Sequence, residues 1–206
     1  MWHDAGLVHC GQCGHSWQFN IEPFKYGGDY ATAYNQRPAV EMSWVRIAHL
    51  FRFARTGKIL DIGYGNGEFI RQALKAGYQA FGYDTHSDAT DLPVVKDTSG
   101  RWDVVTFFDS WEHIEDIGFI DQIDAGLFVV TVPNLPPLAD EAFIRIWKHY
   151  KPNEHLHYFT RDSILRFLSR HGYTLLDVSD IEDVIRKPSG GPFSNTLTYT
   201  FKRGSV

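Results

Sequence analysis

The sequence predicts an α/β fold in which helices cover both faces of a doubly wound, mostly parallel sheet. Short apolar runs alternate with helical patterns from about residue 57 onward, as successive βαβ units require. The chain has 206 residues, which is room for one domain with a modest appendage. About seven strands are expected. Thr alternates with apolar residues over 195–202, which indicates that the last strand is an antiparallel edge or hairpin partner.

The first core element is expected to be a helix that begins near Pro38. Val40, Trp44, Ile47 and Phe51 recur at helical spacing and predict its apolar face. Proline is tolerated in the first turn of a helix, because the N–H group that it lacks has no partner there.

The remaining elements alternate along the chain. Glycines end two of the helices, and a threonine is well placed to cap the last one. The predicted strands are 58–62, 78–83, 103–108, 127–132 and 173–178, and the predicted helices are 68–76 (ended by Gly77), 112–123 and the segment from Thr160 to Gly172.

Composition and charge exclude several classes of protein. The net charge is -5 and no run of Lys or Arg occurs, so the sequence gives no strong signal for binding nucleic acid or a membrane surface. The longest apolar runs, such as 127–132, are far shorter than the roughly 20 residues that span a bilayer. The start of the chain does not show a secretory signal pattern, so we expect a soluble, cytoplasmic protein.

Three alternating glycines follow the strand that ends at Ile62. Gly63, Gly65 and Gly67 allow positive φ and let a ligand approach the backbone closely. A dinucleotide-binding loop would have its third glycine one residue later, and Glu68 would repel a pyrophosphate at the start of the helix. A nucleotide-dependent oxidoreductase is therefore disfavoured.

Two carboxylates flank the glycine loop. Asp61 lies just before it and suits a ligand that carries an ammonium group better than one that carries phosphates. Asp84 lies 17 residues past Gly67, at the end of the next strand. In such folds this position accepts hydrogen bonds from ribose hydroxyls.

These residues resemble the first two motifs of class I S-adenosylmethionine-dependent methyltransferases, which have a Rossmann-like fold. Later segments are similar to the branch that contains ubiquinone methyltransferases, and the resemblance covers about 57–178. It implies a methyltransferase with S-adenosylmethionine as its cofactor. The segments that extend the resemblance are 102–105, 108–116, 130–134 and 154–160.

The resemblance also assigns cofactor-binding residues. The glycine loop and Asp61 would hold the methionine part, Asp84 would bind the ribose, and Phe108 and Asp109 would border the sulfonium and the acceptor. The full set is Asp61, Gly63, Tyr64, Gly65, Gly67, Asp84, Thr85, Asp88, Phe108 and Asp109.

One departure from the family pattern concerns its third strand. Only 18 residues, 85–102, separate the second predicted strand from the next one. We therefore expect a shortened third-strand region of which Val94 and Val95 are the remnant. The acid that contacts adenine in the family has two candidates here, Asp88 and Asp97, and the sequence does not decide between them.

Candidate catalytic residues gather after the predicted strand that ends at Phe108. Methyl transfer to a hydroxyl or amine requires removal of a proton, for which His113, His155 and His157 are candidates, although each could have a purely structural role. Asp109, Glu112 and His113 resemble the Glu-x-x-Glu-His metal site of ubiquinone-biosynthesis O-methyltransferases. The resemblance implies a cluster that binds or deprotonates the acceptor, with Mg²⁺ as the ion that oxygen-rich ligation favours.

The chain has two cysteines, Cys10 and Cys13, which form half of a zinc-knuckle pattern. Any further ligands would be histidines, of which His3, His9 and His15 are nearest. A zinc site that includes His15 competes with a free thiol pair that only forms a turn. A thioredoxin-like redox role is less favoured, because that motif starts a helix after a strand.

The chain divides into an irregular appendage over 1–36 and a methyltransferase-like domain over 37–206. Tyr26, Tyr30 and Tyr34 share one helical face, which either packs on the domain or forms a lid. The loops must build the acceptor pocket, and the expected acceptor is a small molecule, a sugar or a glycan. The alternative is a non-catalytic module that binds S-adenosylmethionine or a partner.

Overall fold

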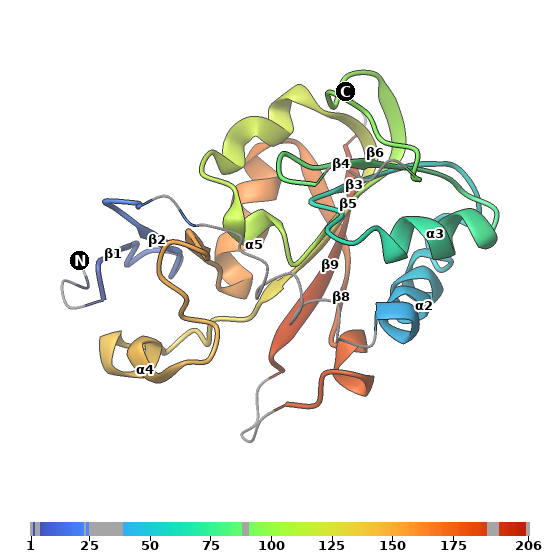
Figure 1. The fold of residues 1–206 in the computed structure, drawn as a ribbon. Coiled ribbons are helices and arrows are strands. Elements are labelled where there is room, and N and C mark those ends of the chain that lie inside the picture. The colour runs from blue at the N-terminus through green and yellow to red at the C-terminus, as the bar shows by residue number, and fades with distance from the viewer. Residues whose placement is uncertain are drawn as a thin grey trace.

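The centre of the molecule is a six-stranded sheet (Figure 1). A computed structural model describes residues 2, 5–22, 24, 39–87, 91–188 and 194–204. The strands of the sheet are β3 (Lys58–Ile62), β4 (Gln79–Tyr83), β5 (Arg101–Phe108), β6 (Asp124–Pro133), β8 (Tyr173–Ser179) and β9 (Thr196–Arg203).

The strand order is β4-β3-β5-β6-β9-β8, and neighbouring strands from β4 to β6 are parallel. β9 is antiparallel to both β6 and β8. This arrangement confirms the predicted α/β class with an antiparallel C-terminal strand, which is the hairpin partner of β8. Thr131 of β6 and Thr198 of β9 face each other, with their hydroxyl oxygens 2.8 Å apart.

The expected seventh strand is reduced to a single bridge. Gly82 pairs with Val94 in parallel, beyond β4 at the edge of the sheet. The Gly82 N–H donates to the Pro93 carbonyl at 2.9 Å, and the Val95 N–H donates to the Gly82 carbonyl at 2.9 Å. The short connection thus leaves room for one bridge where the family pattern has a strand.

Helices cover both faces of the sheet, because successive strand residues point to opposite sides. In β5, Val104 packs with the cluster that contains α2 (Ala39–Leu50) and α3 (Glu68–Lys75). Its neighbour Val105 packs with the cluster that contains α5 (Arg161–Arg170). Figure 1 shows α2 and α3 together on one side and α5 on the other.

The predicted apolar face of α2 is wrong at three of its four positions, since only Ile47 is buried. Val40, Trp44 and Phe51 are 46%, 43% and 38% exposed, whereas Arg46 and His49 are 9% and 1% exposed. The side chains of Arg46 and His49 make specific polar contacts in the interior, with acidic residues and with a threonine hydroxyl respectively. Apolar periodicity therefore selects the wrong side of a helix whose buried face is partly polar.

The helix expected over 112–123 is also wrong. Two short 3₁₀ helices occupy this stretch, η1 (Trp111–His113) and η2 (Ile117–Gln122). Between them Ile114 is extended, and the Asp116 carboxylate accepts a hydrogen bond from the Gly118 N–H at 2.9 Å. This local hydrogen bond starts a new turn in place of a continuous α-helix.

The N-terminal segment is more regular than the sequence indicates. β1 (Leu7–His9) and β2 (Ser16–Gln18) form a hairpin that extends through β7 (His157–Tyr158) into a three-stranded antiparallel sheet. Leu7 packs in a small core with Ile144 of α4 (Glu141–Ile146), beside the main sheet (Figure 1). Strands of three residues are too short to produce a visible period.

Some expectations concern residues that the structure does not describe, namely His3 and the three tyrosines of the expected lid. Among the residues that are described, no helix has the length and apolar character to cross a membrane.

Candidate active site

A cavity of about 410 Å³ opens at the carboxyl ends of β3, β5 and β6. Its wall runs from the glycine loop after β3 to the segment 148–155. The volume lies in the usual range for ligand pockets, and parallel α/β sheets bind ligands at this edge. Another hollow, of about 550 Å³, lies at the amino end of β5 near Arg101 and is not lined by the glycine loop.

The glycine loop adopts the conformation that its sequence predicts. Gly63, Gly65 and Gly67 have φ values of 74°, 55° and 74°. A Cβ at Gly63 would lie 2.5 Å from Ser110 Cβ, and a Cβ at Gly67 would lie 2.0 Å from Leu92 Cδ1. The outer glycines are thus required both by φ and by close packing, which holds the loop against its neighbours.

Asp84 lies directly after β4, beside the glycine loop. Its Oδ2 accepts a hydrogen bond from the Gly65 N–H at 3.2 Å, and its Oδ1 accepts one from the His86 N–H at 2.8 Å. Tyr64 donates its hydroxyl proton to the Ser87 carbonyl at 2.8 Å. These bonds fasten the loop after β4 to the glycine loop.

The two candidates for the adenine contact differ in what the structure describes. Asp88 lies outside the described residues. Asp97 is exposed, does not line the cavity, and accepts a hydrogen bond from the Ser99 N–H at 2.9 Å. Thr85 is exposed next to Asp84, with its hydroxyl 2.9 Å from His86 Nδ1.

Asp61 lies at the floor of the cavity and is 3% exposed. Its Oδ1 accepts a hydrogen bond from the Thr106 hydroxyl at 2.7 Å. Burial raises the pKa of Asp61 to about 7. A cationic ligand group at this position would favour the ionised carboxylate.

Asp109 is held by two arginines at the end of β5. Its Oδ2 is 2.8 Å from Arg46 Nη2, and its Oδ1 is 2.7 Å from Arg186 Nη1. Arg46 Nε also donates to Glu182 Oε1 at 2.7 Å, in η3 (Ile181–Val184). Although burial opposes ionisation, the two guanidinium groups hold the pKa of Asp109 well below its usual value.

Phe108 precedes Asp109 and lines the same cavity. The Phe69 ring meets it edge to face, 4.8 Å away between ring centres. The guanidinium carbon of Arg46 lies 4.4 Å from the centre of the Phe108 ring. Arg46 therefore contacts both residues that were expected to border the sulfonium.

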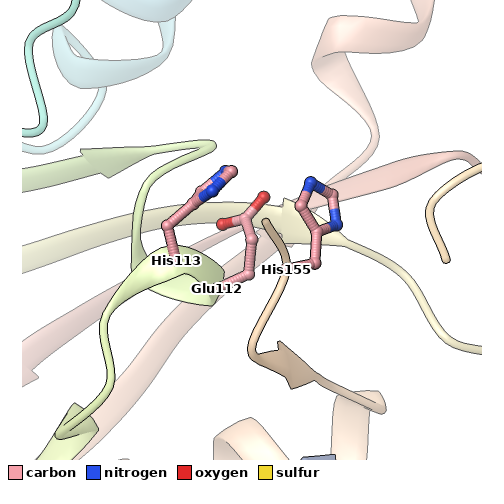
Figure 2. A group of neighbouring side chains, drawn as sticks. All are labelled: Glu112, His113 and His155. Atoms are coloured by element: carbon pink, nitrogen blue, oxygen red, sulfur yellow. The ribbon is translucent and has the colours of Figure 1, made fainter. Parts of the chain in front are cut away.

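Glu112, His113 and His155 form a cluster farther along the cavity wall (Figure 2). Each offers one ligand atom, and these three atoms lie within 4.8 Å of one another. The His113 and His155 rings are 4.8 Å apart between centres, at 79°. Figure 2 shows the Glu112 carboxylate between the two imidazoles, with Glu112 and His113 on η1 and His155 on the segment before β7.

Burial governs the charge of this cluster. It lowers the pKa of His113, and together with His113 and Lys151 it lowers the pKa of His155 to about 2. Burial and the nearby charge of Asp109 raise the pKa of Glu112. Both imidazoles are thus neutral at neutral pH, and His155 as a general base stays a prediction.

The structure groups the residues differently from the metal trio that the sequence suggests. Asp109 is engaged by Arg46 and Arg186, and the residue that joins Glu112 and His113 is His155. In the described ranges this is the sole group of three ligand-type residues that could hold an ion.

His157, another expected base, is not part of the cavity wall. Its Nε2 donates to the Glu115 carbonyl at 3.2 Å, and its Nδ1 is 3.2 Å from His15 Nε2. His15 stacks on Phe159, with ring centres 5.1 Å apart. His157 and His15 therefore join the N-terminal hairpin to the domain.

Cys10 and Cys13 lie in the turn of that hairpin, where the Gly14 N–H donates to the Cys10 carbonyl at 2.8 Å. Backbone N–H groups of Gln12 and Cys13 lower the pKa of the Cys10 thiol, and burial raises that of Cys13. Both cysteines are free, and no third ligand approaches them within the part of the chain described here. His15, the expected third ligand, contacts His157 instead.

Four residues of this site were not predicted from the sequence, because they belong to no motif and reach the site only through the fold. His149 also lines the cavity, with its ring centre 6.5 Å from that of His155. Burial and the nearby Lys148 lower the pKa of His149 to about 4. The four residues are Arg46, His149, Glu182 and Arg186.

Comparisons with known proteins place the chain in a family. Residues 37–178, more than half of the chain, match the family described as Methyltransferase domain. No curated protein matches the chain in sequence.

Several solved structures share the fold. A 1,6-didemethyltoxoflavin-N1-methyltransferase from Burkholderia thailandensis, solved with 1,6-didemethyltoxoflavin and S-adenosylhomocysteine, is 15% identical with a TM-score of 0.60, covering 96% of this chain and 99% of that one. A methyltransferase from Archaeoglobus fulgidus is 16% identical with a TM-score of 0.59, and the match covers 86% of this chain and 100% of that one. A methyltransferase from Mesorhizobium loti is 16% identical with a TM-score of 0.53, and the match covers 79% of this chain and 98% of that one.

The sheet and the glycine loop at its carboxyl edge are those of class I S-adenosylmethionine-dependent methyltransferases. The chain belongs to the methyltransferase domain family.

The charge of Asp109 should contribute to stability far more than that of a surface carboxylate. We expect Asp109→Asn to lower the free energy of unfolding by about 3 kcal/mol, because Arg46 and Arg186 keep Glu182 but lose the second carboxylate that balances their charge. Asparagine tolerates the φ of 55° at this position, so the variant reports charge rather than backbone strain.

Asp177→Asn is the matched control for this measurement. Asp177 pairs with the half-exposed Arg52 at 2.9 Å, and its loss should cost less than about 1 kcal/mol in urea unfolding. Equal losses for the two variants would contradict the role assigned to Asp109.

Acid should destabilise the protein through His15. Burial, with His157 and His9 nearby, lowers the pKa of His15 from 6.5 to about 3. The unfolded chain therefore binds the proton first, so the contribution to stability is complete above about pH 6.5 and is lost as the pH falls toward 3. Between pH 7 and pH 5 this loss is about 2 kcal/mol.

Urea unfolding of the wild type and of His15→Asn at both pH values isolates this contribution. The variant should lose about 2 kcal/mol less than the wild type between pH 7 and pH 5. The same loss in both proteins would show that His15 is not the acid-sensitive group.

Proposed function

We propose that this chain transfers the methyl group of S-adenosylmethionine to a hydroxyl or amine of a small-molecule acceptor, sugars included. The observation that carries the proposal is the single cavity that joins the glycine loop to the cluster of Glu112, His113 and His155. A donor at one end and an acceptor at the other would then share one reaction space, which aligns them for transfer.

We assign the cofactor to the glycine-loop end of the cavity. The positive φ values at Gly63 and Gly65 bring the backbone close to a ligand. Asp84, which already accepts a hydrogen bond from the Gly65 N–H, has the position and charge to accept hydrogen bonds from a ribose. Asp61 suits the ammonium group of the methionine part, because a cation would stabilise its buried carboxylate.

The chemistry is an in-line displacement. A lone pair of the acceptor oxygen or nitrogen attacks the methyl carbon, and the bond from carbon to sulfur breaks. The electron pair of that bond stays on sulfur and yields S-adenosylhomocysteine, while the acceptor proton passes to water. The chain has to align the two reactants and exclude competing water.

We assign the acceptor to the far end of the cavity, beyond Phe108. Glu112 and His113 line this end and offer polar atoms that can bind and orient an acceptor hydroxyl or amine. The similar enzyme from Burkholderia thailandensis, which holds 1,6-didemethyltoxoflavin, supports a small acceptor.

Calorimetry with S-adenosylhomocysteine tests the cofactor end. The wild type should bind it, and Asp84→Asn should weaken binding about 10- to 100-fold, because hydrogen bonds to a charged group contribute about 1.5–3 kcal/mol. Asp103→Asn is the matched control: its carboxylate also accepts a backbone hydrogen bond, from Lys58 N at 2.7 Å, but at the amino end of β5. Absent binding by the wild type, or equal weakening in both variants, would refute the assignment.

The acceptor class is tested by methyl labelling. The protein is incubated with S-adenosylmethionine labelled in its methyl group and an extract of the source organism, and the extract is then separated by molecular mass. Label should accumulate in the small-molecule fraction. Label confined to protein or nucleic acid would contradict a small acceptor and leave the cofactor assignment standing.

A further inference from the structure

Several buried polar atoms of the cavity wall lack hydrogen-bond partners, among them His149 Nε2, and three of these atoms belong to one cluster. Glu112 Oε2, His113 Nδ1 and His155 Nδ1 are buried, and none of them has a hydrogen-bond partner in the described structure. Glu112 and His155 are 1% and 4% exposed, so their side chains are almost fully removed from solvent. Buried polar atoms in native proteins nearly always have partners, so three orphans in one cluster indicate a ligand.

The arrangement of the three residues fits a metal ion. Their ligand atoms lie within 4.8 Å of one another. An ion about 2.0–2.2 Å from each nitrogen or oxygen would sit among them after small side-chain rotations. Glu112 and His113 are adjacent on η1, and His155 approaches from a different segment, so two parts of the chain would close on the ion (Figure 2).

The donor set disagrees with the magnesium site that the sequence suggests. Mg²⁺ prefers oxygen ligands, and one of the two carboxylates of that site, Asp109, is engaged by Arg46 and Arg186. The residues that do come together offer two imidazole nitrogens and one carboxylate. Such a set suits Zn²⁺, Co²⁺ and similar first-row ions.

We propose that Glu112, His113 and His155 bind a divalent first-row transition-metal ion, with Zn²⁺ preferred over Mg²⁺. Three protein ligands leave at least one coordination position open, as in catalytic zinc sites. All three residues line the cavity, so the open position is available to a molecule within it.

The role of this ion rests on the proposed function. A bound divalent ion lowers the pKa of a coordinated hydroxyl, which is the property that an acceptor needs before methyl transfer. The chain would contribute the orientation: Glu112, His113 and His155 would fix the ion in the cavity that Phe108 and the glycine loop also line.

The test must distinguish metal binding at this cluster from metal binding by the thiols of Cys10 and Cys13. Protein with Cys10→Ser and Cys13→Ser, made without a histidine tag and stripped with a chelator, is titrated with ZnCl₂ and with MgCl₂ by calorimetry. One Zn²⁺ per chain should bind, at least about 100-fold more tightly than Mg²⁺. With CoCl₂, visible absorption bands of nitrogen and oxygen ligation should appear without the near-ultraviolet band of a thiolate.

Variants assign the ligands. Glu112→Gln, His113→Asn and His155→Asn should each weaken Zn²⁺ binding by at least about 10-fold. The matched control is His149→Asn, a buried cavity histidine outside the cluster, which should bind Zn²⁺ like the parent protein. Circular dichroism establishes that each variant is folded.

Two results would overturn the proposal. The first is the absence of Zn²⁺ binding by the cysteine-free protein, which needs no further variant to interpret. The second is binding that survives in the three cluster variants or is lost in His149→Asn. Neither result depends on S-adenosylhomocysteine, whose binding is measured separately, so failure here is distinguishable from failure of the proposed function.

Discussion

The ion pairs of Asp109 join three distant parts of the chain at the carboxyl edge of the sheet. Arg46 comes from α2 and Arg186 follows η3, and both meet the carboxylate at the end of β5, with Glu182 as a second anion beside them. Charges removed from water are tolerated only when they are paired, so each of these segments depends on the others for its position. The wall of the cavity is built on this network.

The same ion pairs also determine which neighbouring side chains are free to bind a ligand. With Asp109 committed to two arginines, Glu112 and His113 form a cluster with His155, which is the one such group of three among the described residues. Arg46 packs on Phe108 as well, so one helix residue contacts both the aromatic and the acidic side of the cavity. The glycine loop lines the same cavity, and close packing against Leu92 and the hydrogen bond from the Gly65 N–H to Asp84 fix its shape.

The fold and the cofactor loop could be predicted because their signals are local. The alternating elements and the spacing of Gly63, Gly65 and Gly67 can each be recognised within a short stretch of sequence. Consecutive Cα atoms are about 3.8 Å apart, so residues this close in sequence must also lie close together in space. The partners of Asp109 could not be predicted in this way, because Arg46 and Arg186 lie 63 and 77 residues away in sequence and belong to no motif. The same buried polar contacts explain why the apolar period of α2 indicated the wrong face.

In our proposal cofactor and acceptor share one cavity, which both the glycine loop and the cluster of Glu112, His113 and His155 line. A crystal structure of the complex with S-adenosylhomocysteine tests it most directly. We expect electron density for the cofactor product along Gly63–Gly67, with the sulfur beside Phe108 and facing the cluster. Density in the hollow near Arg101, or a sulfur that faces away from the cluster, would contradict it.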